Sequence, residues 1–106
     1  MNTAMGDKIR TLRKTQGYTL EQLAERAGSS KSYIWELENK APPRPSAELL
    51  TRIATALGVT IDYLLDETGS VTEEDSADVA FYRKYKKLDD ADRARLRKMI
   101  DLWDED

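Results

Sequence analysis

The chain of 106 residues contains no cysteine and no histidine. Without cysteine it cannot form a disulfide or use a thiolate nucleophile. Without histidine it lacks the commonest general base and the commonest metal ligand. Carboxylates are abundant, but no pattern joins a nucleophile, a base and a binding loop. We therefore expect a protein that is not an enzyme and has no metal or other cofactor.

Long apolar runs are absent as well. No segment approaches the roughly 20 residues that a membrane-spanning helix needs, and the first residues lack the apolar stretch of a signal peptide. The sequence is 40% hydrophobic and 35% charged, which favours a folded domain over a disordered or membrane protein. We expect a cytoplasmic protein with no membrane partner, formed by one compact domain and an appendage.

The two parts of the chain differ in charge. Residues 1–65 carry nine basic and seven acidic side chains, a net of +2, whereas residues 66–106 carry eight basic and thirteen acidic side chains, a net of −5. A surface that binds phosphates needs local positive charge, and the average charge of the chain does not decide this. The net charge of −3 therefore does not exclude a nucleic-acid-binding surface in the first part.

The sequence contains a series of amphipathic helical patterns separated by glycine, proline and capping residues. In one of them Leu49, Leu50, Ile53 and Leu57 recur at the spacing of a helix. The three prolines within residues 41–45 exclude a helix there, because proline fixes φ and lacks a backbone donor. Five helices are predicted in the first part, at about residues 7–16, 20–27, 31–39, 47–57 and 61–65.

The second and third predicted helices lie very close together in the sequence. Thr19 and Gln22 have the spacing of a capping box at the start of the second helix. Only Gly28, Ser29 and Ser30 separate its end from the third helix. Such a short turn makes two helices cross steeply. The N-terminal end of the third helix is then free to enter a DNA major groove, which is about 12 Å wide.

Three segments of the sequence together resemble the Cro and phage-repressor (Xre) family of helix-turn-helix regulators. They are TLEQLAERAG at 19–28, SSKSYIWELEN at 29–39 and ALGVTIDYLL at 56–65. With the first helix, the resemblance covers about residues 5–66. It implies an all-α fold, a five-helix phage-repressor-like helix-turn-helix domain, followed here by two C-terminal amphipathic helices. It also implies that double-stranded DNA is the partner.

The resemblance assigns base-reading roles to three residues of the third helix. Lys31 and Ser32 align with the front of the recognition helix, and Glu36 follows one turn later. Lysine can donate to guanine, serine can pair with several base edges, and glutamate can accept from cytosine. The alternative is that these three residues are ordinary solvent-exposed side chains with no role in binding. Glu36 is also repelled by phosphates, so it would serve mainly to reject wrong bases.

The resemblance also implies contacts to the DNA backbone and one structural ion pair. Removing one partner of a buried ion pair costs roughly 3–5 kcal/mol. The residues expected at phosphates are Ser30 (also the cap of the third helix), Asn39, Lys40 and Arg44, and those expected to form the pair are Arg13 and Glu38.

Three positions depart from the pattern of the family. Leu20 stands where the family often has a glutamine that touches a phosphate, and Lys40 replaces the usual glycine after the recognition helix. Trp35 lies on the outer side of that helix, where small polar residues are common. Its ring either packs on a thymine methyl or a sugar, or covers a neighbouring helix.

The C-terminal third is predicted to be a separate unit. We divide the chain into a DNA-binding domain at 1–66, a linker at 67–75 and a helical extension at 76–106. The extension is too apolar to leave its faces in water. It could pack back on the first domain, dimerise or bind another protein. Its candidate dimer or partner surface comprises Phe81, Tyr85, Leu96, Met99, Ile100 and Trp103.

The sequence thus predicts a sequence-specific transcriptional regulator. Dimerisation is favoured because one recognition helix reads few base pairs. We expect a homodimeric repressor of a palindromic operator, with a regulatory protein as a further partner by family resemblance. The alternative is a protein-interaction module, such as an antitoxin or adaptor that acts through its C-terminal helices.

Overall fold

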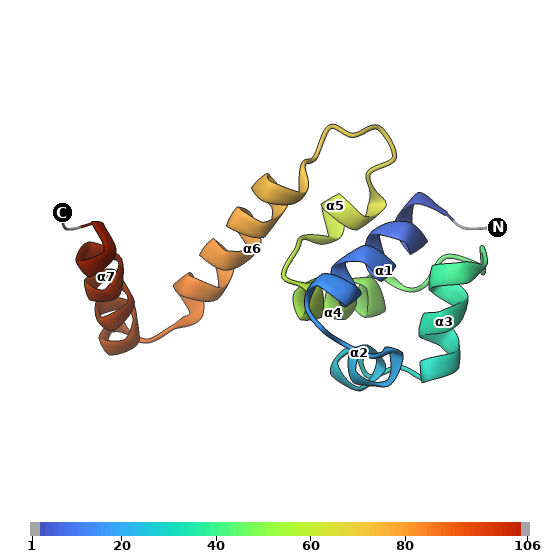
Figure 1. Ribbon diagram of the computed structural model, residues 1–106, viewed down its shortest axis with the longest axis horizontal. Helices are drawn as coiled ribbons and strands as arrows, with labels where there is room; N and C mark the ends of the chain where they lie inside the picture. Colours follow the sequence, from blue (N-terminus) through green and yellow to red (C-terminus); the bar gives the residue numbers. More distant parts are fainter. Residues whose placement is uncertain (1–2, 105–106) are drawn as a thin grey trace.

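The computed structural model describes residues 3–104 and is all-helical over that range (Figure 1). This confirms the predicted fold class. Five helices form a compact N-terminal bundle, and two longer helices extend from it. In order, the helices are α1 (Ala4–Thr15), α2 (Leu20–Ala27), α3 (Lys31–Asn39), α4 (Ala47–Leu57), α5 (Ile61–Leu65), α6 (Glu73–Lys87) and α7 (Asp90–Asp104).

Hydroxyl side chains begin the first six helices. Each accepts a hydrogen bond from a backbone N–H in the first turn, which would otherwise lack a partner. At α2 the capping box is complete: Gln22 N donates to Thr19 Oγ1 over 3.1 Å, and Thr19 N donates to Gln22 Oε1 over 2.8 Å. The six caps are Thr3, Thr19, Ser30, Ser46, Thr60 and Thr72.

The core of the bundle is made from the apolar faces of α1 to α5. α1 packs against α3, and α2 packs against both α3 and α4. Leu20, at the start of α2, is only partly buried against this core. The largest apolar side chains with almost no exposure are Ile9, Leu23, Ile34, Leu37, Leu50, Ile53, Leu57 and Leu64.

α1 begins at Ala4, three residues before the predicted start at Asp7. The extra turn contains Gly6, where the backbone of α1 lies against the end of α3. A Cβ atom at Gly6 would be 2.4 Å from the carbonyl oxygen of Leu37 and 3.2 Å from that of Glu38. Both neighbours are backbone atoms, which cannot move aside as a flexible side chain can. Glycine therefore sets how closely α1 and α3 approach.

Arg13 and Glu38 form a bidentate ion pair between α1 and α3. Arg13 Nε lies 2.7 Å from Glu38 Oε2, and Arg13 Nη2 lies 3.0 Å from Glu38 Oε1. A third donor of the same guanidinium, Nη1, reaches the carbonyl oxygen of Tyr18 over 2.9 Å. The Glu38 side chain is only 1% exposed. Arg10 Nε adds a second, longer contact to Glu38 at 3.6 Å.

α6 is attached to the bundle by a buried hydrogen bond. The backbone N–H of Thr60 donates to Ser76 Oγ over 2.8 Å, and the two hydroxyl oxygens lie 3.0 Å apart. Ser76 is 2% exposed. Because α6 begins at Glu73, residues 73–75 of the predicted linker are helical. The sequence interpretation missed this because those three residues are acidic, a composition that also suits a linker.

The loop between α5 and α6 is ordered by its own side chains. The Asp66 carboxylate accepts from Val71 N over 3.0 Å and from Thr68 Oγ1 over 2.7 Å. These hydrogen bonds, first the Val71 amide and then the Thr68 hydroxyl, lower the pKa of Asp66 to about 2. Lys8 Nζ donates to the carbonyl oxygens of Tyr63 (2.8 Å) and Asp66 (2.7 Å). The end of α5 is thus tied to α1 just before the loop begins.

α7 projects from the bundle, and none of its described residues is buried (Figure 1). Asp89 caps it by accepting from Asp92 N over 2.8 Å. The option that the extension packs back on the first domain is therefore wrong for α7. Trp103 is 75% exposed, and Met99 and Ile100 are about half exposed (48% and 47%). Only the first half of α6 contributes a buried residue, Ser76.

We expect the substitution Gly6→Ala to lower the free energy of unfolding. Alanine would gain roughly 0.5–1 kcal/mol of helix propensity, but overpacking against backbone atoms costs about 1–3 kcal/mol. Urea unfolding followed by circular dichroism measures the difference. Ala4→Gly, in the same turn, is the matched control for propensity. A Gly6→Ala variant more stable than the wild type would contradict the close approach of α1 and α3.

Candidate nucleic-acid interface

α2, the short turn and α3 form a helix-turn-helix unit at one end of the bundle (Figure 1). Gly28 ends α2 in the left-handed conformation, with φ 67°. That conformation lets the chain reverse sharply, and glycine adopts it without a Cβ penalty. Arg52 of α4 donates to the carbonyl oxygen of Ala27 over 2.7 Å. The turn is thereby fixed to the helix behind it.

The three predicted base-reading residues lie on α3, and two of them are at its exposed start. Lys31 has a 59% exposed side chain, and Ser32 is exposed. Glu36 is half-buried, so it is less accessible than the other two. Lys31 Nζ lies 3.5 Å from Glu21 Oε1 on α2. An exposed pair of this kind is worth about 0.2–1 kcal/mol, so it does not prevent Lys31 from turning toward another partner.

Two of the predicted phosphate-binding residues make hydrogen bonds within the protein. Ser30 Oγ accepts from Tyr33 N over 3.1 Å as the cap of α3, which leaves its hydroxyl hydrogen free to donate. Asn39 Oδ1 accepts from Arg10 Nη2 over 2.8 Å, and its amide donates to the carbonyl oxygen of Trp35 over 3.0 Å. Asn39 thus joins α1 to α3, and its amide nitrogen keeps a second N–H that can donate.

Lys40 and Trp35 lie together at the end of α3. The Lys40 ammonium is 5.5 Å from the centre of the Trp35 ring, a cation–π arrangement. Trp35 is 43% exposed, so its ring does not enter the core. Lys40 is the C-cap residue and has extended backbone, with φ −129°. The glycine usual in the family is therefore not needed here, because this φ suits any residue.

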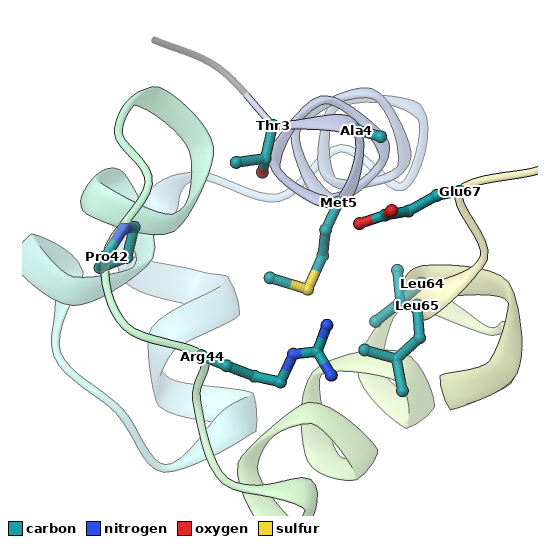
Figure 2. Close-up of a pocket in the computed structure, with 8 residues that line it drawn as sticks. All are labelled: Thr3, Ala4, Met5, Pro42, Arg44, Leu64, Leu65 and Glu67. Atoms are coloured by element: carbon teal, nitrogen blue, oxygen red, sulfur yellow. The ribbon is translucent and has the colours of Figure 1, made fainter.

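Arg44 lies on the loop between α3 and α4 and lines a cavity of about 160 Å³. Figure 2 shows its guanidinium pointing into this cavity, toward Met5 of α1 and Leu65 of α5, with Glu67 on the far side. The structure does not bring Arg44 together with Lys31 and Ser32. To bind a phosphate beside α3, this exposed side chain would have to turn out of the cavity.

Two contributors to this surface were missed by the sequence analysis. Glu21 pairs with the base-reading candidate Lys31, and Arg10 fixes Asn39. Both contacts join side chains of two different helices, and such contacts cannot be predicted from the periodicity of a single helix. An acidic residue just after the cap of α2 is also well explained by the helix dipole. No signal in the sequence therefore distinguished Glu21 from an ordinary surface charge.

Other kinds of site find no support in the described residues. Within residues 3–104, no three potential metal ligands come together. No helix of that range is long and apolar enough to cross a membrane.

Comparison with protein families gives a match in the same region. A family model described as "Helix-turn-helix" (HTH_3) matches residues 9–64, more than half of the chain. The HTH-type transcriptional regulator SinR of Bacillus subtilis (strain 168) is 40% identical over 63 residues. That match covers 59% of this chain and 57% of SinR. The immunity repressor protein of Bacillus phage phi105 is 32% identical over 101 residues, covering 94% of this chain and 67% of the repressor.

Solved structures agree with these matches. A crystal structure of SinR in complex with DNA is 39% identical, with a TM-score of 0.55, and the match covers 58% of this chain and 98% of that one. A SinR and SinI protein complex is 28% identical, with a TM-score of 0.57 over 94% of both chains. The chain therefore belongs to the Cro and Xre family of helix-turn-helix regulators.

Proposed function

We propose that this protein is a repressor that binds a palindromic DNA operator as a homodimer. The observation that carries this proposal is the exposed start of α3, where Lys31 and Ser32 face solvent on a helix fixed from behind. Base-edge donors on a rigid helix are what direct readout in the major groove requires. The relative SinR, solved in complex with DNA, supports the same role.

Contacts to the DNA backbone would come from residues around α3. Ser30 has a free hydroxyl hydrogen, and Lys40 has an exposed ammonium beside Trp35. Such contacts set affinity and register, whereas Lys31 and Ser32 would set sequence preference. Asn39 would hold α3 against α1 through Arg10 and would offer its second N–H to a phosphate.

The extension supplies the apolar surface for dimerisation. We call the exposed apolar side chains of α6, α7 and the turn between them the C-terminal apolar face; they are Val79, Phe81, Tyr82, Leu88, Met99, Ile100, Leu102 and Trp103. Large apolar side chains left exposed in this way mark a candidate interaction site. A two-fold dimer places two recognition helices on half-sites about 34 Å apart. The predicted members Tyr85 and Leu96 are half-buried rather than fully exposed.

The dimer would repress transcription by blocking access of other proteins to the promoter DNA. A dimer bound over a promoter excludes other proteins from the same DNA and needs no further activity. The phage phi105 relative, which matches over 94% of this chain, is named an immunity repressor. This similarity extends through α6 and α7 and therefore supports the whole arrangement.

A second role is that of a module for protein interaction. The C-terminal apolar face is also suited to a regulatory protein, and the SinR relative is solved in a complex with the protein SinI. In that case the extension would control DNA binding, as an adaptor or antitoxin does. The two roles are compatible if the same face exchanges a second copy for a different partner.

Selection of bound duplexes from a randomised DNA pool tests the proposed function. We expect a two-fold symmetric motif with half-sites about one helical turn apart, roughly 34 Å, because two recognition helices bind one face of the duplex. The protein should be used as the full chain at near-physiological salt. A folded protein that enriches no motif would overturn the DNA-binding role, and an unsymmetric motif would overturn the homodimer.

Lys31→Ala should relax sequence preference at one base position of each half-site. The expected loss is about 1–3 kcal/mol for the preferred base only, because a base contact distinguishes bases whereas a phosphate contact does not. Binding to the selected operator and to single-base variants measures this. Lys86→Ala on α6 is the matched control for loss of one exposed charge. Equal weakening on all sequences would exclude base reading by Lys31.

Arg44→Ala separates a phosphate contact from a purely structural role. If Arg44 leaves its cavity to bind a phosphate, the slope of log K against log salt should decrease by about 0.9. Operator binding measured over a salt series gives this slope, with Lys40→Ala beside it as an exposed cation close to α3. An unchanged slope together with lower stability toward urea would show that Arg44 only packs against α1 and α5.

A further inference from the structure

A groove lies between α4 and α6, formed by two adjoining hollows. The first has a volume of about 180 Å³ and is bordered by the hydroxyls of Thr51, Thr55 and Thr60 and by Arg83, Lys84 and Lys87. The second, about 420 Å³, shares Thr51, Thr55 and Lys84 with the first and adds Tyr18, Arg26 and Arg52. We call the two together the α4–α6 groove.

The groove concentrates positive charge in a chain whose net charge is −3. Five of its bordering side chains are cationic: Arg26, Arg52, Arg83, Lys84 and Lys87. Within residues 3–104, no carboxylate borders either hollow. Among the described residues, only one of the five cations, Arg52, has an ion-pair partner, Glu48 at 2.9 Å. Arg26 instead lies over the Tyr18 ring at 4.6 Å.

The arrangement of cations on α6 is unfavourable in the free protein. Arg83 and Lys87 are four residues apart and therefore neighbours on one face, and like charges at this spacing destabilise a helix. The helix dipole favours basic residues in the last turn, which suits Lys84, Lys86 and Lys87. It does not explain why Arg83, Lys84 and Lys87 border the same hollow while Lys86 does not. An anionic occupant would offset this repulsion.

The α6 side of the groove is separate from the proposed DNA-binding surface, whereas Arg52 on its other side contacts the turn before α3. Figure 1 shows α3 and α6 at opposite sides of the bundle, with α1 and α4 between them. A duplex bound along the start of α3 would therefore not reach the α6 side of the groove. The groove is also separate from the C-terminal apolar face, since none of its bordering residues belongs to that face.

We propose that the α4–α6 groove binds an acidic peptide segment of a partner protein. Its open, elongated form over two hollows suits a chain of several carboxylates better than a compact anion, which would need the cations gathered around one point. Carboxylates would pair with Lys84, Arg83 and Lys87 and accept from the Thr55 hydroxyl. Small apolar residues of the peptide would pack on Ala54 and Ala80, which also border the first hollow. This proposal does not depend on the proposed role in DNA binding.

Titration of the isotope-labelled full chain with a capped peptide of alternating glutamate and alanine, followed by NMR, tests the proposal. The amide signals of Thr51, Thr55, Thr60 and Ala80 should shift and saturate, with weaker binding at higher salt. Lys84→Glu should weaken binding by about tenfold or more, because a bound carboxylate would meet a like charge. Lys86→Glu, on the same turn but outside the groove, should have a much smaller effect.

Four outcomes would overturn the proposal. One is that no saturable shift occurs at these four amides in the folded wild type. Another is that Lys84→Glu and Lys86→Glu weaken peptide binding equally, which would indicate only a diffuse attraction of opposite charges. If inorganic pyrophosphate shifts the same amides as strongly as the peptide, the site is one for a small anion. If a duplex of unrelated sequence does so, the groove is a DNA contact.

Discussion

The ion pair between Arg13 and Glu38 is the interaction on which the rest of the bundle depends. One guanidinium connects α1 to the end of α3 and to the α1–α2 loop at Tyr18. Its partner is a carboxylate with almost no contact with water. Burying such a pair costs desolvation energy, so its contribution lies more in fixing one geometry than in net stability. The geometry that the pair fixes is the orientation of α3, the recognition helix, relative to α1.

Around this pair, α3 is held from two directions. Arg10 and Asn39 add a hydrogen bond close to Glu38, and Gly6 allows α1 to approach the same end of α3. At its other end, α3 follows a turn that Arg52 fixes to α4. The exposed start of α3 therefore projects from a rigid support. A site built to read base edges needs such rigidity, because small displacements lose the hydrogen-bond geometry.

Local signals in the sequence predicted most of the bundle. The capping box of Thr19 and Gln22, the cap at Ser30 and the short turn at Gly28 each act over a few residues, and the structure has all three. The start of α1 was placed too late because Gly6 is a poor helix former. Glycine is required at this position because the backbone of α3, which is distant in sequence, leaves no room for a Cβ atom.

The candidate site was only partly accessible to sequence reasoning. Family resemblance and spacing located α3, but not the direction of long side chains around it. Arg44 points into a cavity beside Met5, and Asn39 is engaged by Arg10. Both arrangements depend on α1, which precedes them by about thirty to forty residues, and neither has a periodic signature. The same limit concealed the α4–α6 groove, whose cations come from three different helices.

The hydrogen bond from Thr60 to Ser76 has a consequence for how proteins of this architecture can recombine. The family match ends at residue 64, but a residue twelve positions later completes the cap region of α5. The five-helix bundle and the C-terminal extension therefore cannot be exchanged independently, because the residues that join them also contribute a buried hydrogen bond. A foreign extension grafted after α5 would need a small hydroxyl residue at the matching place. Without one, it would leave a buried backbone donor unsatisfied in the recipient domain.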